Sequence, residues 1–128
     1  MKVLVSDKLG QEGIDSLQQQ GFTVDVKTGL SPEELNSVIG DYEGLVVRSA
    51  TKVTRELIAY ADKLLVVGRA GTGVDNIDIP ACTERGIMVC NTPGSNTNAT
   101  AELAVALAFA VFRHIPRANH MTHHDDFR

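Results

Sequence analysis

Three short loops carry most of the residues in this sequence that could do chemistry. Each follows an apolar run, and they span Arg48–Thr51, Arg69–Asn76 and Asn91–Asn98. In the first loop, the guanidinium of Arg48 and the hydroxyl of Ser49 offer a charged fork beside a short donor, which suits a carboxylate or a phosphate. The alternative is that Arg48 pairs with a neighbouring acid, and the spacing leaves both interpretations open.

The second loop contains the turn Gly71-Thr72-Gly73. Glycines let a ligand approach the backbone closely, and successive N–H groups can surround an anion; a plain tight turn is the alternative. The spacing resembles the dinucleotide fingerprint Gly-x-Gly-x-x-Gly, but Asn76 stands in the place of the third glycine. No strand ending in a ribose-binding acid follows within about twenty residues, so we reject this fingerprint here.

The third loop, Asn91–Asn98, is dense in short side chains that donate or accept hydrogen bonds. One asparagine in it would cap the helix that follows, which does not account for three asparagines. We therefore treat this loop as a third candidate for ligand contacts.

Asp7 suggests a second class of function. It follows the first apolar run, where a receiver domain keeps acidic residues, so the chain could be a non-enzymatic, flavodoxin-like binding or signalling module. The phosphoacceptor carboxylate of such a module should follow the third strand, where this chain has Arg48. Topology alone does not assign a function, and this alternative is the weaker one.

The end of the sequence contains a group of histidines and acids that could bind a metal: His120, His123, His124, Asp125 and Asp126. The group lies in a polar tail without buried neighbours, so we interpret it as solvated. No nucleophile has an adjacent general base, and no histidine is placed near the three loops. The sequence therefore indicates no catalytic residue and no metal site.

The elements that must position these loops alternate between strands and helices. Strands are predicted at Lys2–Ser6, Phe22–Val26, Gly44–Val47, Leu64–Gly68 and Ile87–Val89. The intervening helices carry N-cap signals at Ser31, Thr54 and Asp78. This alternation predicts an α/β fold with a doubly wound parallel five-stranded sheet, covered on both faces, in the flavodoxin-like order 2-1-3-4-5. Ligands bind at the carboxyl ends of such strands, where the three loops fall.

A separate apolar stretch follows the third loop. All ten residues of Leu103–Phe112 are apolar, within a helix expected to open at Thr100. A helix that is apolar all round must be buried on every side or meet a partner, and this one is too short to span a bilayer. The sheet can cover one stripe of it, so we predict a second domain or a homo-oligomer formed through Leu103–Phe112.

Composition excludes some partners and favours one compartment. The chain has 12 lysines and arginines against 16 acids, and its net charge of −4 argues against a nucleic-acid or anionic-membrane surface. Cys82 and Cys90 lack Cys-x-x-Cys spacing and are expected to be reduced core thiols of a cytoplasmic protein. The first residues show a strand pattern, without the layout of a signal peptide.

Three segments in order, Val46–Thr54, Val66–Asp78 and Gly86–Leu107, closely resemble the amino-terminal part of the NAD-dependent D-2-hydroxyacid dehydrogenases. The likeness is strongest to the members that oxidise 3-phosphoglycerate, and it runs from Lys2 to about Arg117. It implies a substrate-binding domain at residues 1–98. A linker helix and the start of a truncated nucleotide-binding domain would follow at residues 99–128.

The resemblance implies contacts with a small anionic substrate, 3-phosphoglycerate or another 2-hydroxy acid. The residues implied are Arg48, Ser49, Arg69, Gly71, Thr72, Gly73 and Asn96. Arg48 and Ser49 would meet the acidic groups of the substrate, with Arg69 as a secondary anion contact. Thr72 would also reach the NAD cofactor from the substrate side.

This chain also departs from the family. The family places its Gly-x-Gly-x-x-Gly fingerprint and its catalytic arginine, glutamate and histidine beyond this length, and none of the four histidines here takes that position. The full-length reaction implied is hydride transfer between NAD and 3-phosphoglycerate, which gives 3-phosphohydroxypyruvate on the way to serine. We expect this chain alone to bind substrate, to bind NAD weakly at most, and to lack dehydrogenase activity.

Overall fold

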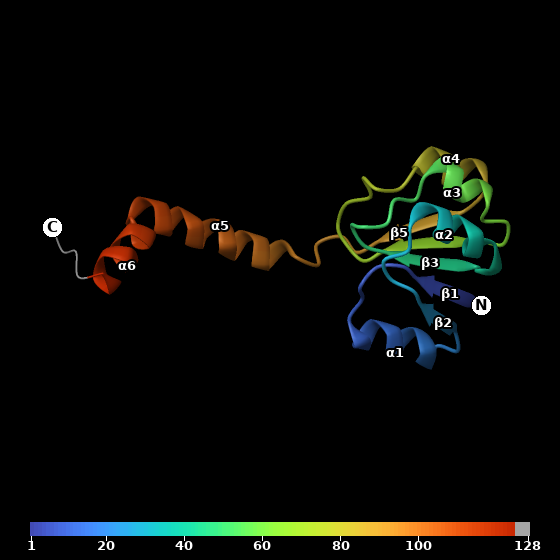
Figure 1. Cartoon of the computed structure of the whole chain (residues 1–128), viewed down its shortest axis with the longest axis horizontal. Helices are drawn as coiled ribbons and strands as arrows, with labels where there is room; N and C mark the ends of the chain where they lie inside the picture. The colour runs from blue at the N-terminus through green and yellow to red at the C-terminus, as the bar shows by residue number, and fades with distance from the viewer. Residues whose placement is uncertain (125–128) are drawn as a thin grey trace. The chain divides into compact units, whose positions relative to one another are not determined.

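The computed structural model describes residues 1–124, and its first part is built around one parallel sheet (Figure 1). The strands are β1 (Lys2–Val5), β2 (Thr23–Val26), β3 (Gly44–Val47), β4 (Val66–Arg69) and β5 (Met88–Asn91). Their order is β2-β1-β3-β4-β5, and every neighbouring pair is parallel. The predicted α/β fold and strand order are confirmed.

The helices connect these strands and then continue beyond them. They are α1 (Gln11–Gln19), α2 (Pro32–Val38) with the short 3₁₀ turn η1 (Ile39–Asp41), α3 (Arg55–Ala59), α4 (Ile79–Glu84), α5 (Thr97–Phe112) and α6 (Ile115–His123). All three predicted N-caps form: Ser31, Thr54 and Asp78 each accept a hydrogen bond from a backbone amide in the first turn. The α2 cap is the full capping box.

The core lies between the sheet and the group of helices α2, α3 and α4. Strand register aligns Leu4, Leu45 and Val67 in one row across β1, β3 and β4, and each is almost fully buried. Leu35 of α2, Leu57 and Ile58 of α3, and Cys82 of α4 complete the same cluster. Alternation along each strand explains the row, because side chains two residues apart share a face.

Cys90 corrects the prediction that both cysteines lie in the core. Both thiols are free, but Cys82 is buried and Cys90 is exposed. Val89 of β5 packs against the core cluster, so the alternation of β5 turns Cys90 to the other face of the sheet. Met88, also on that face, is 64% exposed, so the predicted cover of both faces does not extend over β5 in the described structure.

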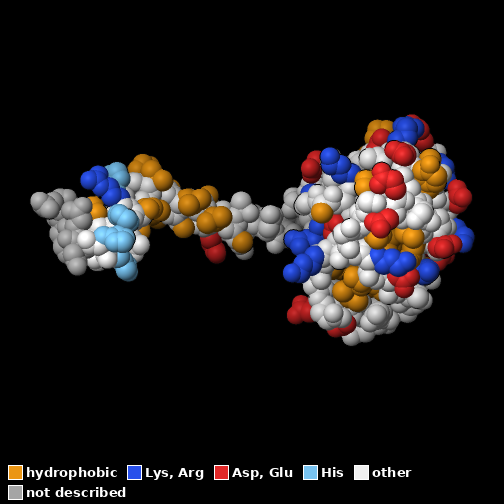
Figure 2. Space-filling model, in the orientation of Figure 1, with side chains coloured by type: hydrophobic (Ala, Val, Ile, Leu, Met, Phe, Trp, Pro, Cys, Tyr) orange, Lys and Arg blue, Asp and Glu red, His pale blue; other side chains and the backbone are white. Residues whose placement is uncertain are grey.

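The described chain divides into a first unit, Met1–Pro93, and a second unit that begins at Gly94. The second unit consists of α5 and α6, and α5 starts three residues before the helix start expected at Thr100. Its apolar side chains are open to solvent: Leu103 is 60%, Phe109 62% and Phe112 78% exposed. Figure 2 shows the hydrophobic side chains that follow one another along this helix.

The polar tail forms a helix that the sequence analysis did not anticipate. The helix α6 has Pro116 in its first turn, and His114 before it adopts a left-handed conformation that separates it from α5. Among residues 1–124, no three histidine, cysteine or acidic side chains are placed to hold one metal ion. Asp125 and Asp126, part of the weighed metal group, lie outside the described residues.

No single helix in the described part of the chain is long and apolar enough to cross a membrane. Taken together, α5 and α6 meet the length and composition of a membrane span, but the two helices are bent by 62° at the break between them.

Candidate functional site

The Arg48–Thr51 loop at the end of β3 is held by the carboxylate of Asp7, which follows β1. Asp7 Oδ2 accepts hydrogen bonds from the amides of Arg48 at 2.7 Å and Ala50 at 3.2 Å. Asp7 Oδ1 accepts one from Thr51 Oγ1 at 2.6 Å, and the Thr51 amide lies 3.1 Å from both carboxylate oxygens. Asp7 is only 7% exposed, so one buried side chain fixes the backbone of this loop.

The charge on Asp7 is stabilised by these donors. Burial acts to raise the pKa of Asp7, but the hydrogen bonds from Thr51, Arg48 and Ala50 favour the ionised form and together hold the pKa below its usual value. The carboxylate is therefore ionised at neutral pH. Its role in the described structure is to shape the loop.

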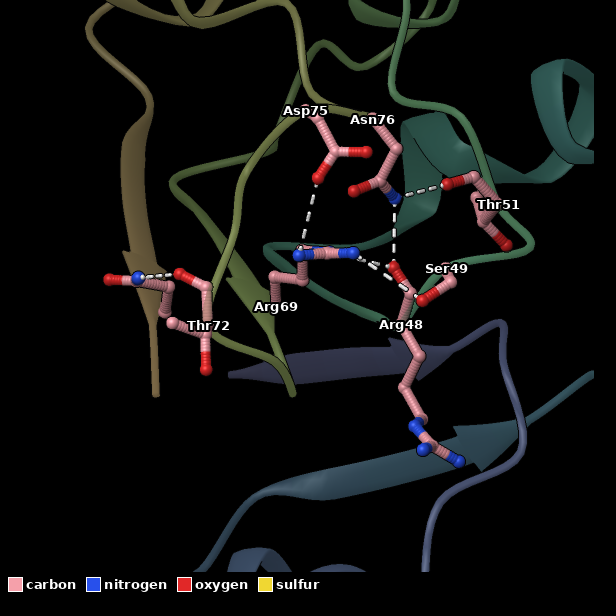
Figure 3. Close-up of polar contacts among 8 residues, drawn as sticks. Arg48, Ser49, Thr51, Arg69, Thr72, Asp75 and Asn76 are labelled. Atoms are coloured by element: carbon pink, nitrogen blue, oxygen red, sulfur yellow. Dashed lines mark hydrogen bonds and ion pairs between the residues drawn. The ribbon is translucent and has the colours of Figure 1, made fainter. Parts of the chain in front are cut away.

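The side chain of Arg48 has no acidic partner among the residues that the structure describes. Among residues 1–124 it forms no ion pair, so the alternative that it pairs with a neighbouring acid finds no support. One of its nitrogens, Nη1, donates to the carbonyl of Lys8 at 3.2 Å. Figure 3 shows the guanidinium of Arg48 pointing away from Arg69 and Asn76. Several of its N–H groups remain available to an anion.

Arg69, at the end of β4, contacts the Arg48–Thr51 loop through its side chain. Its Nε donates to the carbonyl of Arg48 at 3.1 Å, its Nη2 donates to Ser49 Oγ at 3.4 Å, and its Nη1 lies 3.6 Å from Asp75 Oδ1. The side chain is 10% exposed, against 84% for Asp75. These contacts hold two loops together, and the contact of Arg69 with an anion remains a prediction.

Asn76 also connects the loop that follows β4 to the Arg48–Thr51 loop. Its Nδ2 donates to the carbonyls of Arg48 at 2.8 Å and Thr51 at 2.6 Å, as drawn in Figure 3. Two carbonyl oxygens demand a donor, so the chemistry of the partners sets the orientation of this amide. Asn76 Oδ1 is buried and has no hydrogen-bond partner within the described residues.

The glycines of the Gly71-Thr72-Gly73 turn leave room for the side chains of Arg69 and Asp75. Neither glycine has a positive φ angle, so their use here is close approach and not a left-handed turn. A Cβ at Gly73 would lie 2.9 Å from Asp75 Oδ1 and 3.1 Å from Arg69 Nη1, and one at Gly71 would lie 3.4 Å from Arg69 Nη1. Within the described chain, the amide of Gly73 donates no hydrogen bond, which leaves it available to a ligand.

The start of the third loop is tied to this turn. Asn91 Nδ2 donates to the carbonyl of Thr72 at 2.7 Å, and the amide of Thr92 donates to the carbonyl of Gly71 at 3.0 Å. The strands β3, β4 and β5 are neighbours, so the first unit brings the loop at Arg48, the turn and Asn91 to one edge. Asn96 belongs to the second unit, as the N-cap of α5, and its contact with substrate stays a prediction.

Two hollows open beside these loops. A cavity of about 290 Å³ lies between the loop at Asp7 and the helices α2 and α3, with Leu35 and Leu57 among its walls. A more open hollow of about 500 Å³ is lined by Ser49, Asp75 and Asn76 among others. The second hollow adjoins two of the predicted loops.

Sequence reasoning missed the positioning role of Asp7 and Asn76. The sequence suggested Asp7 only as one of the acidic residues that a receiver domain keeps after its first strand, and Asn76 only as the residue in the place of a third glycine. The signal that could have found them is the strand order: β3 lies between β1 and β4, so residues that follow those strands must flank Arg48. Apart from the Thr51 hydroxyl, the hydrogen-bond partners of these two side chains are backbone atoms, which leave no mark in the sequence.

The residues of this chain do not fit a complete NAD site. A dinucleotide loop needs a third glycine for close packing of strand and helix, and here that position is Asn76, whose side chain is engaged with two carbonyls. The helix after the turn, α4, begins only at Ile79. The turn therefore lacks the third glycine and the directly following helix of a pyrophosphate-binding loop.

Fold and site together define an α/β domain with flavodoxin-like strand order and an anion-compatible edge at the carboxyl ends of its strands. Comparison with known proteins identifies the family within this class. The chain matches the family described as D-isomer specific 2-hydroxyacid dehydrogenase, catalytic domain, over residues 3–123. The chain belongs to this family.

Individual relatives agree with this assignment. The chain is 54% identical over 119 residues to a D-3-phosphoglycerate dehydrogenase of Archaeoglobus fulgidus, covering 93% of this chain and 23% of that protein. A solved structure from Thermus thermophilus has a TM-score of 0.87 and 34% identity, covering 100% of this chain and 42% of that one. An NAD⁺-bound 3-phosphoglycerate dehydrogenase of Entamoeba histolytica has a TM-score of 0.78 and 34% identity, covering 88% and 39%. The chain thus spans less than a quarter of the length of the Archaeoglobus protein.

Proposed function

We propose that this chain is the substrate-binding part of an NAD-dependent dehydrogenase that oxidises 3-phosphoglycerate to 3-phosphohydroxypyruvate in serine biosynthesis. The observation that carries the proposal is the fixed Arg48–Thr51 loop. Its backbone is held by Asp7, Arg69 and Asn76, and the guanidinium of Arg48 has no acidic partner in the described chain. A guanidinium carried by a loop whose backbone is already fixed loses less entropy when it binds a carboxylate or a phosphate.

The role of the chain in the reaction would be positioning. Arg48 and Ser49 would hold the acidic groups of the substrate, and the amide of Gly73 would hold its carboxylate end. Fixed contacts at both ends orient the reacting carbon, which is a large part of what positioning contributes to catalysis. Thr72 and Asn96 would contact the same substrate, and Thr72 would also face the cofactor.

NAD would supply the hydride acceptor in the complete enzyme. The chain described here has neither the glycine fingerprint nor an assigned acid/base group, so we propose that it does not catalyse the reaction alone. Free thiols at Cys82 and Cys90 agree with a cytoplasmic location, which is also part of the proposal. The signalling alternative draws no support from Asp7, whose carboxylate is already engaged by the loop.

Calorimetric titration of the purified chain tests the proposal. We expect binding of 3-phosphoglycerate, no measurable binding of NAD and no NADH formed when both are present. Failure of 3-phosphoglycerate to bind would contradict the substrate assignment, and NADH formation would contradict the inactivity of the chain. Stable phosphorylation by a small phosphodonor would instead favour the signalling module.

We also propose that the chain forms homo-oligomers through Leu103–Phe112 of α5. Contiguous exposed apolar surface is costly in water, and Leu107 and Phe109 are 57% and 62% exposed. Sedimentation at micromolar concentration should show association, and Leu107→Glu should shift the chain to monomer. The control is Leu65→Glu, because Leu65 is an equally exposed leucine, 59%, outside α5. A wild-type chain that sediments as a monomer would disprove this contact.

A further inference from the structure

Asn76 joins the two loops to which the proposed function assigns the substrate. It follows the Gly71-Thr72-Gly73 turn in sequence, yet its Nδ2 donates to the carbonyls at both ends of the Arg48–Thr51 loop, at 2.8 Å and 2.6 Å. The carbonyl of Arg48 accepts a further hydrogen bond from Arg69 at 3.1 Å. The peptide that precedes Ser49 is therefore held by donors from the end of β4 and from the turn beyond it.

The backbone around Asn76 is fixed independently of its side chain. The carbonyl of Asn76 accepts a hydrogen bond from the amide of Val53 at 2.8 Å, and the amide of Asp78 donates to the carbonyl of Val53 at 2.8 Å. Ile77 between them is buried in the core. These backbone hydrogen bonds position the Cα of Asn76 without its amide side chain, so the side chain can be replaced while the surrounding fold remains.

The contacts of Asn76 with the Arg48–Thr51 loop are made by the N–H donors of its amide and not by its amide oxygen. Asn76 Oδ1 is buried without a hydrogen-bond partner among the described residues, which costs stability. The two N–H donors of the amide are the part of Asn76 that the loop uses.

We infer that Asn76 is a positioning residue for substrate binding: it couples the glycine turn to the Arg48–Thr51 loop and holds Arg48 and Ser49 in the conformation that meets the anion. This inference rests on the proposed function for its ligand. The hydrogen bonds from Asn76 to the Arg48–Thr51 loop do not depend on any ligand. The two parts can therefore be measured separately.

The decisive variant is Asn76→Asp, which keeps the shape of the side chain and replaces both N–H donors by an acceptor facing two carbonyls. We expect the amides of Ala50 and Thr51 to exchange with solvent about tenfold faster or more in the free chain, since loop opening loses two hydrogen bonds. We expect 3-phosphoglycerate to bind about tenfold to a hundredfold more weakly to the folded variant. Asn76→Ala, which adds no charge, should change both quantities in the same direction.

A swapped variant controls for charge. Asp75→Asn combined with Asn76→Asp keeps the net charge and both residue types, and it moves the donor by one residue at the cost of the Arg69–Asp75 ion pair. Asp75 is 84% exposed, so its own replacement is expected to matter little. If the donor is what counts, the swapped chain should bind as weakly as Asn76→Asp. If the added charge is what counts, it should bind like the wild type, and the inference is overturned.

The remaining outcomes also decide. Unchanged exchange at Ala50 and Thr51 would show that Asn76 does not hold the loop. Faster amide exchange with an unchanged affinity for 3-phosphoglycerate would show that the hydrogen bonds from Asn76 to the loop have no role in binding. That result would overturn the positioning role. If the wild-type chain binds no 3-phosphoglycerate, the proposed function is wrong, and the exchange comparison alone decides whether Asn76 holds the loop.

Discussion

Replacing Asp7 by alanine should lower the free energy of unfolding by about 2–4 kcal/mol. The substitution leaves the amides of Arg48, Ala50 and Thr51 without the buried carboxylate that accepts their hydrogen bonds. Hydrogen bonds to a charged group are stronger than neutral ones, and here several share one acceptor. Urea denaturation followed by circular dichroism measures the change.

An exposed carboxylate provides the control for this variant. Asp15 accepts a hydrogen bond from Gln11 at 2.7 Å on the surface of α1, so Asp15→Ala should cost less than about 0.5 kcal/mol. If Asp7→Ala destabilised the chain no more than Asp15→Ala does, the central role given to Asp7 would be wrong.

The pH dependence of stability should follow the same carboxylate. The pKa of Asp7 is lowered in the folded chain because the hydrogen bonds from Thr51, Arg48 and Ala50 outweigh the opposing effect of burial. A group whose folded pKa is depressed stabilises the fold fully above its unfolded pKa and loses this contribution as the pH falls through its folded pKa. The difference in unfolding free energy between wild type and Asp7→Ala should therefore be constant near neutral pH and shrink below about pH 4.

Replacing Arg48 by alanine should weaken the binding of 3-phosphoglycerate by about tenfold to a hundredfold. The reason is the loss of a guanidinium that can donate two parallel hydrogen bonds to one acidic group. Arg48→Lys keeps the charge and loses the fork, so its affinity should lie between those of the wild type and the alanine variant. Titration calorimetry measures all three, and raised salt should weaken the wild type most.

A second exposed arginine shows whether the effect is local. Arg55 on α3 pairs with Glu84 and is 58% exposed, away from the three loops, so Arg55→Ala should leave the affinity for 3-phosphoglycerate unchanged. Equal affinities for wild type and Arg48→Ala would remove Arg48 from the substrate site. A similar loss in both alanine variants would indicate general electrostatic attraction instead of a specific contact.

Much of the fold could be predicted because its signals are local. Apolar runs, caps at Ser31, Thr54 and Asp78, and glycines after helices are patterns within a few residues, and they led to the correct elements and strand order. The errors have physical causes as well. Cys90 is exposed because alternation along β5 turns Val89, its neighbour, to the core. The helix α6 was missed because its segment, Ile115–His123, is rich in polar side chains and was interpreted as a polar tail.

The sequence by itself determined which loops meet at the edge of the sheet, because a strict alternation of strands and helices allows few topologies. It also determined the family, through three segments that occur in order. The tertiary structure decided which residues shape the site. Asp7, Arg69 and Asn76 reach backbone groups between 21 and 44 residues away. Every residue carries the same backbone groups, so the sequence cannot indicate which of them a distant side chain will bind.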